Sequence, residues 1–149
     1  MGTWLTEAEL ATRYGAARLL ALADRDGDGH ADPGVIEAAI GEAESRARSR
    51  LLVRYQPADL PAAPEAASAA LKRVVAQLAF AFLHELHDVK GQDVYDASDA
   101  ALAELSDLAR GQASLVLASE PPRDVSRSSV LTTKTGEDAR FTLAAMEDW

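Results

Sequence analysis

Apolar residues recur at steps of three and four along much of the chain, the spacing that places them on one face of an α-helix. The pattern predicts three long helices, at about residues 33–55, 66–87 and 93–110. The first is expected to bury Ile36, Ile40, Ala43, Ala47, Leu51 and Tyr55. The second has the most continuous apolar face and is expected to be the most buried, through Leu71, Val74, Val75, Leu78, Phe82 and Leu86. The third is expected to bury Val94, Ala101, Leu105 and Leu108.

The predicted helices begin and end at residues with recognisable capping signals. Thr6 and Glu9 have the spacing of a capping box, which predicts a short N-terminal helix before a second short helix at 16–23. Asp32 followed by Pro33 predicts the N-cap and the first residue of the first long helix. That helix cannot continue through the segment that contains Pro57, Pro61 and Pro64.

The pattern changes after about residue 118. Residues 119–149 begin with prolines and are mostly polar, so they bury too little apolar surface to fold alone. The last part of this segment nevertheless carries Phe141, Leu143, Met146 and Trp149. We therefore predict a helical domain over residues 1–118 and an extended C-terminal arm over 119–149, whose apolar residues bind another protein surface.

The composition agrees with an all-α protein, a small bundle of four to five helices with an extended C-terminal arm. Alanine and leucine are abundant and aromatic residues make up only 5% of the chain. The absence of cysteine excludes disulfides and thiolate metal sites. The formal net charge of −9 argues against binding to nucleic acid phosphates. The most apolar window, VVAQLAFAFL, is too short to span a bilayer, and no membrane association is expected.

The stretch DRDGDGHAD, residues 24–32, resembles the front half of an EF-hand calcium loop. The candidate calcium ligands are Asp24, Asp26, Asp28 and Asp32, with His30 through its carbonyl oxygen. An EF-hand loop closes with a glutamate at position twelve, where this chain has Val35. Any calcium binding is therefore expected to be weak, at about 10⁻⁴ to 10⁻³ M, and no cofactor is expected to be required. A tight turn whose aspartates cap helices explains the same residues.

Two further polar patterns are less specific. His84 and His87 flank Glu85, but they are three residues apart, whereas a zinc protease motif needs four. The sequence contains no nucleophile elbow or P-loop either, and we predict that the protein is not an enzyme.

Three arginines at four-residue spacing suit a solvated face or a contact with another subunit: Arg46, Arg50 and Arg54.

Five short motifs occur in a fixed order along the chain: RYG, DRDGDG, LLVRY, LKR and ARGQASL. With these motifs in this order, nearly the whole chain resembles the small neck proteins of Mu-like phages and prophages. The resemblance implies a structural virion protein, the head–tail connector or adaptor of tailed phages. It implies a cyclic homo-oligomer, expected to be a dodecamer, located in the virion neck and assembled in the host cytoplasm. The implied partners are the portal protein and a stopper or tail-completion protein, with DNA only passing through the channel.

Two other functions stay open at this point. A calcium-dependent helical binding module would use the DRDGDG loop, and a chelator should unfold it or release its partner. A regulatory helical protein should be a stable monomer with no affinity for a portal. An adaptor should instead assemble or dock through its arm, and a chelator should have no effect on it.

Overall fold

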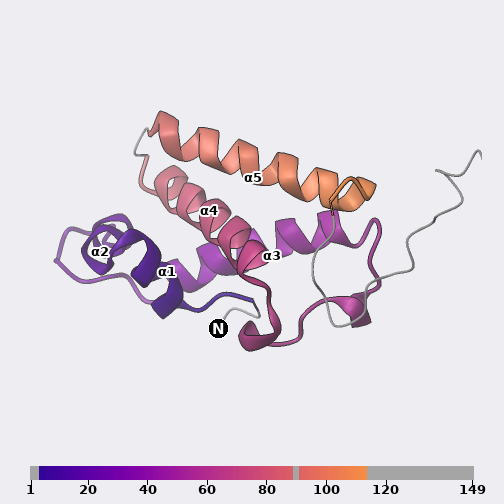
Figure 1. The fold of residues 1–149 in the computed structure, drawn as a ribbon. Helices are drawn as coiled ribbons and strands as arrows, with labels where there is room; N and C mark the ends of the chain where they lie inside the picture. Colours follow the sequence, from indigo (N-terminus) through magenta and orange to yellow (C-terminus); the bar gives the residue numbers. More distant parts are fainter. Residues whose placement is uncertain (1–3, 89–90, 114–149) are drawn as a thin grey trace, which may run out of the picture.

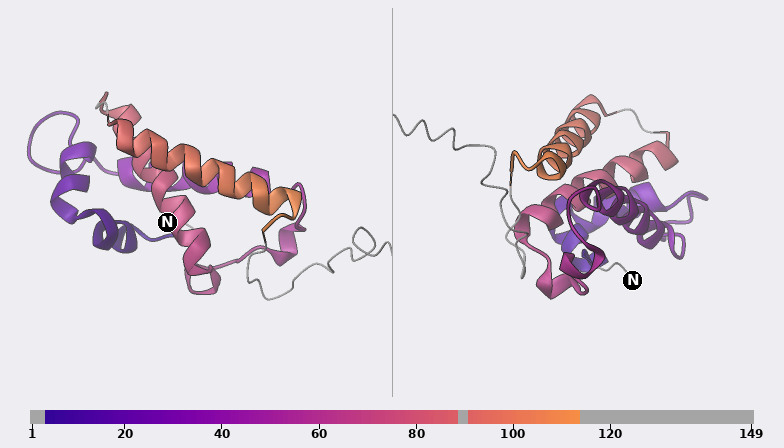
Figure 2. Two further views of the ribbon diagram at one scale, coloured as in Figure 1. Left: turned by 45° about the horizontal axis from the view of Figure 1, so that its top comes forward. Right: turned by 90° about the vertical axis from the view of Figure 1, so that its right-hand side faces the viewer.

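The computed structural model describes residues 4–88 and 91–113, and these residues form a helical body without strands (Figure 1). Its elements are α1 (Glu7–Tyr14), α2 (Ala16–Ala23), α3 (Val35–Leu51), η1 (Pro57–Asp59), η2 (Pro64–Ala66), α4 (Ala69–Leu86) and α5 (Gln92–Arg110). The three long helices pack against one another, and the short pair α1 and α2 lies at one end (Figures 1 and 2). The predicted all-α fold is confirmed.

The capping box forms as predicted at the start of α1. The Thr6 hydroxyl accepts a hydrogen bond from the Glu9 amide, and the Glu9 carboxylate accepts one from the Thr6 amide at 2.9 Å. Gly15 then separates α1 from α2 with a φ of 90°, a conformation in which a β-carbon is strained. This break lets two short helices turn back on each other where one longer helix would otherwise continue.

Helix α3 is shorter at both ends than predicted. It begins at Val35, after Gly34 in the left-handed conformation, and not at Pro33. The left-handed backbone of Gly34 is incompatible with a helix that runs on from Pro33, and the Asp32 carboxylate accepts from the Arg25 amide at 3.2 Å in the preceding loop. At the other end the helix stops at Leu51, and Tyr55 follows in a turn, although it is buried as expected.

Helix α4 forms the centre of the core, in contact with both α3 and α5 (Figure 2). Its buried side chains include Leu71, Val74, Val75, Leu78, Phe80 and Leu83. The prediction was wrong for Leu86: it is the last residue of α4, it lines a surface groove beside α3, and it is 50% exposed. Phe82 and Val94 are only partly buried. Helix α5 packs through Ala101, Leu105 and Leu108 as predicted.

The segment between α3 and α4 runs across the body and is fastened to the N-terminus. The Trp4 indole N–H donates to the Pro61 carbonyl at 2.7 Å, and Trp4 is fully buried. Within residues 4–88 and 91–113, no helix combines the length and the apolar character that crossing a membrane requires. The predicted arm, residues 119–149, lies outside the described residues.

Candidate functional site

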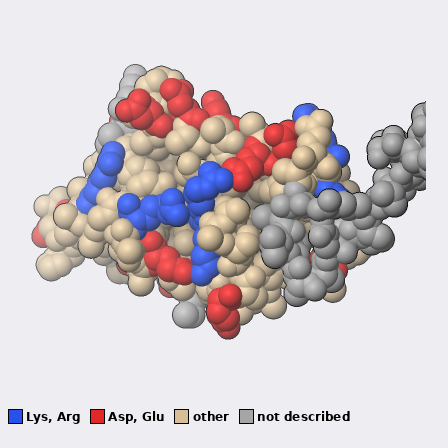
Figure 3. Space-filling view, in the orientation of Figure 1, with Lys and Arg blue, Asp and Glu red and all other residues tan. Residues whose placement is uncertain are grey.

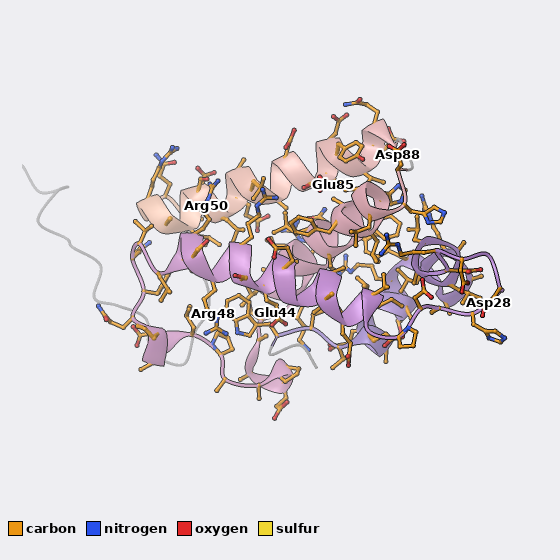
Figure 4. All side chains as sticks on the ribbon, turned by 180° about the vertical axis from the view of Figure 1, so that it is seen from behind. Asp28, Glu44, Arg48, Arg50, Glu85 and Asp88 are labelled. Carbon is orange, nitrogen blue, oxygen red and sulfur yellow. The ribbon has the colours of Figure 1, made fainter. Side chains whose placement is uncertain are left out.

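The aspartate loop, residues 24–32, joins α2 to α3 and is organised by Asp24 (Figure 4 labels Asp28 at its outer edge). One oxygen of Asp24 accepts from the amides of Gly27, at 2.7 Å, and Asp28, at 3.1 Å. Its second oxygen accepts from the Gly29 amide at 2.9 Å. Gly27 and Gly29 have φ angles of 78° and 85°, which glycine adopts without strain, so the chain can wrap around the carboxylate.

Asp26 and Asp28 also accept hydrogen bonds from backbone amides of the loop, in each case from the residue two positions ahead. The Asp28 amide donates to Asp26 at 3.2 Å, and the His30 amide donates to Asp28 at 2.7 Å. Together they bring oxygen atoms of Asp24, Asp26 and Asp28 within 4.8 Å of one another. Among the described residues this is the single group of three acidic or histidine side chains with such spacing.

The electrostatics of Asp24 follow from these hydrogen bonds. Desolvation raises the pKa of Asp24, but the amides of Gly29, Gly27 and Asp28 and a hydrogen bond with Asp26 together outweigh it. The net result is a pKa below the ordinary value of 3.8, so the carboxylate is charged at neutral pH. The loop is therefore an anionic, preorganised turn, and its backbone amides already serve as the partners of its carboxylates.

The structure thus brings together the side-chain oxygens of three of the predicted metal ligands, Asp24, Asp26 and Asp28. Asp32 accepts a hydrogen bond from the Arg25 amide, and ligation by the His30 carbonyl stays a prediction. Val35, at the closing position of the loop, is the first residue of α3 and offers no side-chain oxygen. Hard oxygen ligands suit calcium, whereas the missing closing carboxylate weakens such a site. A role in metal binding stays a prediction.

The predicted arginine face is in contact with other helices of the same chain. Arg46 lies over the Phe82 ring, 5.2 Å from its centroid. Arg50 donates to the Ser106 hydroxyl at 2.8 Å. Arg54 donates to the carbonyls of Leu108 and Ala113 at the end of α5. Arg46 and Arg50 are still exposed, and a contact of these two side chains with another subunit stays a prediction.

The histidine pattern at the end of α4 has a structural role for at least one residue. His84 is buried and packs edge-on against Phe80, with ring centroids 4.7 Å apart. Phe80 in turn stacks on Tyr14 at 4.0 Å, and burial raises the pKa of Tyr14 above its ordinary value. These contacts join α1 to α4.

The predicted partner-binding residues of the arm lie outside the described residues: Phe141, Leu143, Met146 and Trp149.

The sequence interpretation missed a buried carboxylate on α3. Glu44 is 6% exposed, and its Oε1 accepts from the amides of Trp4, at 2.7 Å, and Leu5, at 3.1 Å. Arg48 lies over the Trp4 ring, 4.7 Å from its centroid. Figure 4 shows Glu44 and Arg48 on the side of α3 that faces the proline-containing segment. The available signal was a glutamate four residues after Ile40, on the apolar face of α3.

The surface charge is unevenly distributed. Figure 3 shows a band of basic side chains across one face, with acidic side chains on both sides of it. Two ion pairs join helices that are distant in sequence: Lys72 with Glu9, and Arg73 with Glu104. The net negative charge therefore does not produce a uniformly acidic surface.

The comparison with protein families decides the identity of this helical body. The family model described as "Bacteriophage Mu, Gp36" matches residues 4–133. The chain belongs to this family. The match begins at Trp4, the residue that Glu44 fastens to α3, and it includes the aspartate loop and the five α-helices of the described residues.

Membership of the Mu Gp36 family confirms the resemblance to Mu-like phage proteins that the motifs predicted. In general terms it makes the chain a phage structural protein and a virion component. No curated protein matches the chain.

Proposed function

We propose that this member of the Mu Gp36 family is a head–tail adaptor, a ring of identical copies between the portal and the stopper or tail. The observation that carries the proposal is the family match over residues 4–133, which includes the whole helical body. The proposed role is structural and not catalytic. It needs a body whose shape is held firmly, and the Glu44 and Arg54 contacts provide this by joining elements distant in sequence.

A ring requires contacts between two different surfaces of each copy. Such a heterologous contact, repeated about an axis, closes into a cyclic assembly. We propose a dodecamer in the virion neck, assembled in the host cytoplasm. DNA passes through its channel, and the net charge of −9 limits attraction between the ring and the phosphates.

The arm, residues 119–149, is the proposed contact with the portal, the stopper or a neighbouring copy. Large apolar side chains are typical anchors of such contacts, and the arm carries Phe141, Leu143, Met146 and Trp149.

A variant lacking residues 135–149 should keep the helical content and the melting temperature of the isolated protein. It should fail to join heads to tails. Unfolding of this variant would instead assign the arm to the core of its own copy.

Deletion of the gene in a phage-producing strain tests the adaptor function directly. We expect filled heads and separate tails by electron microscopy, with joined particles restored when the wild-type chain is supplied from a plasmid. A map of the neck should show a ring of this chain against the portal. Normal yields of infectious, joined particles without the gene would overturn the proposal.

A second candidate function, a weak calcium site, is favoured by the clustered oxygens of Asp24, Asp26 and Asp28. The loop would hold the ion through these carboxylates, with an expected Kd of about 10⁻⁴ to 10⁻³ M. Calorimetry with calcium on the wild-type chain and on Asp28→Asn tests this, because the variant should lose the heat signal. No heat at millimolar calcium would support the turn-and-cap interpretation, whereas unfolding of the wild type by chelator would support a calcium-dependent binding module.

A further inference from the structure

An apolar projection lies at the end of α3. Leu52 and Val53, in the turn that follows the helix, are 41% and 75% exposed. Arg50, one turn earlier on α3, is exposed as well. Single exposed apolar residues are normal on protein surfaces, but here two consecutive ones lie beside a cation. We name Arg50, Leu52 and Val53 the α3 knob.

A groove of complementary character lies between the first half of α3 and the end of α4. Its volume is about 350 Å³, and it is lined by Ala38, Ala39, Glu42, Phe82, Glu85 and Leu86. Leu86 is 50% exposed, and Arg46 borders the groove over Phe82. The surface is thus apolar, with the two carboxylates of Glu42 and Glu85 and the guanidinium of Arg46 beside it. We name it the α3–α4 groove.

The knob and the groove cannot meet within one copy. Glu42 and Val53 are eleven positions apart on one helix and its terminal turn, a separation of roughly 17 Å along the axis. Figure 4 shows Arg50 near the C-terminal end of α3, and Glu85 and Asp88 toward the other end of the molecule. Two matching surfaces at opposite ends of a rigid body have the geometry of a heterologous contact.

We propose that the α3 knob of one copy inserts into the α3–α4 groove of the next copy, with Arg50 facing Glu42 and Glu85. This inference rests on the proposed adaptor function and identifies the surfaces through which its copies meet. Burial of Leu52 and Val53 against Phe82 and Leu86 drives the association. The opposite charges determine which end meets which and disfavour knob-to-knob pairing.

Cysteine cross-linking tests this contact, because the wild-type chain contains no cysteine. The double variant Val53→Cys/Leu86→Cys is supplied to the gene-deleted phage strain, and the purified particles are oxidised. We expect a ladder of covalent multimers of this chain under denaturing, non-reducing conditions. The matched control is Val53→Cys/Leu20→Cys, since Leu20 is an apolar residue of α2 that is also 38% exposed. It should give no ladder.

The outcomes separate this inference from the adaptor function. If the double-cysteine variant restores joined particles but stays monomeric on oxidation, the knob–groove contact is wrong and the adaptor function stands. If Val53→Cys alone gives a covalent dimer, the contact is two-fold and the inference is overturned. If deleting the gene does not affect head–tail joining, the proposed function itself fails.

Charge reversal provides a second test that does not depend on disulfide geometry. Glu85→Arg places like charges at the contact and should lower the yield of joined particles by at least roughly tenfold. Arg50→Glu in the same chain reverses the other side of every contact, so the double variant should recover most of the yield. Circular dichroism checks that each variant keeps its helical content. If the losses in particle yield from the two charge reversals add and the double variant shows no recovery, the pairing of Arg50 with Glu85 is overturned.

Discussion

Asp24 and Glu44 are both carboxylates that accept hydrogen bonds from backbone amides, Asp24 in a surface loop and Glu44 in the interior. Asp24 accepts three backbone amides from residues three to five positions ahead, at the surface. Glu44 accepts two backbone amides from residues about 40 positions away, in the interior. The first organises a loop through contacts within five positions, whereas the second fastens Trp4 and Leu5 to α3. The cost of losing each bond should therefore differ, since water can replace a partner only at the surface.

The largest effect is expected from Glu44→Ala. The change leaves the amides of Trp4 and Leu5 buried without their acceptor, and each such group costs about 1–3 kcal/mol. The free energy of unfolding of the helical body should fall by roughly 2–6 kcal/mol in urea denaturation. Glu42→Ala, two positions away on the exposed face, is the matched control and should change it by less than about 0.5 kcal/mol. Equal effects of the two substitutions would contradict the role of Glu44.

A smaller loss is expected from Trp4→Phe, on the other side of the same contact. The variant removes the hydrogen bond to Pro61 and weakens the stacking of Arg48, which together should cost about 1–3 kcal/mol. Urea denaturation followed by circular dichroism measures the change. In a Trp149→Phe background Trp4 is the single tryptophan, and its fluorescence should report burial until the body unfolds. Early exposure of Trp4, before the loss of helix, would mean that the N-terminus is not part of the cooperative unit.

An intermediate case is Glu9, which combines a local cap with a long-range partner. The hydrogen bond from Lys72, together with those from Thr6, holds the pKa of Glu9 below its ordinary value of 4.5. Its stabilisation is therefore fully present above about pH 4.5 and is lost as the pH falls through the lower folded pKa. Glu9→Gln keeps the cap but loses the charge, and should cost less than about 1 kcal/mol at pH 7.

The pH dependence of Glu9→Gln provides its control. The difference in unfolding free energy between wild type and variant should shrink toward zero as the carboxylate of the wild type is protonated. A difference that persists unchanged at pH 3 would show that the charge of Glu9 is not the source of the stabilisation.

The smallest effect on global stability is expected from Asp24→Asn. The substitution removes an acceptor oxygen and the charge, so the amides of Gly27 and Gly29 should exchange with solvent faster while the helices keep their protection. Because the pKa of Asp24 is lowered in the folded state, its contribution is fully present above about pH 3.8 and is lost as the pH falls through the lower folded pKa. Amide hydrogen exchange followed by NMR measures the loop directly. Destabilisation as large as that of Glu44→Ala would show that the loop and the core unfold together.

Much of the local structure could be predicted because its interactions join residues close in sequence. The capping box of Thr6 and Glu9, the break at Gly15 and the clustering of Asp24, Asp26 and Asp28 all depend on contacts within five positions. The helical period located the apolar faces of α4 and α5 for the same reason, since residues three and four apart share a face in any α-helix.

Tertiary structure decided the remaining features because their partners are distant along the chain. Asp32 was available as a helix cap by sequence, yet the fold of the loop places it against the Arg25 amide. Glu44 and Arg54 resemble ordinary charged residues of a helix until the N-terminus and the end of α5 are brought against them. Leu86 has the spacing of a core residue, but it is the last residue of α4 and stays 50% exposed in a surface groove beside α3. Periodicity identifies which side of a helix is apolar, whereas only the packing of complete helices determines how far along that side a partner covers it.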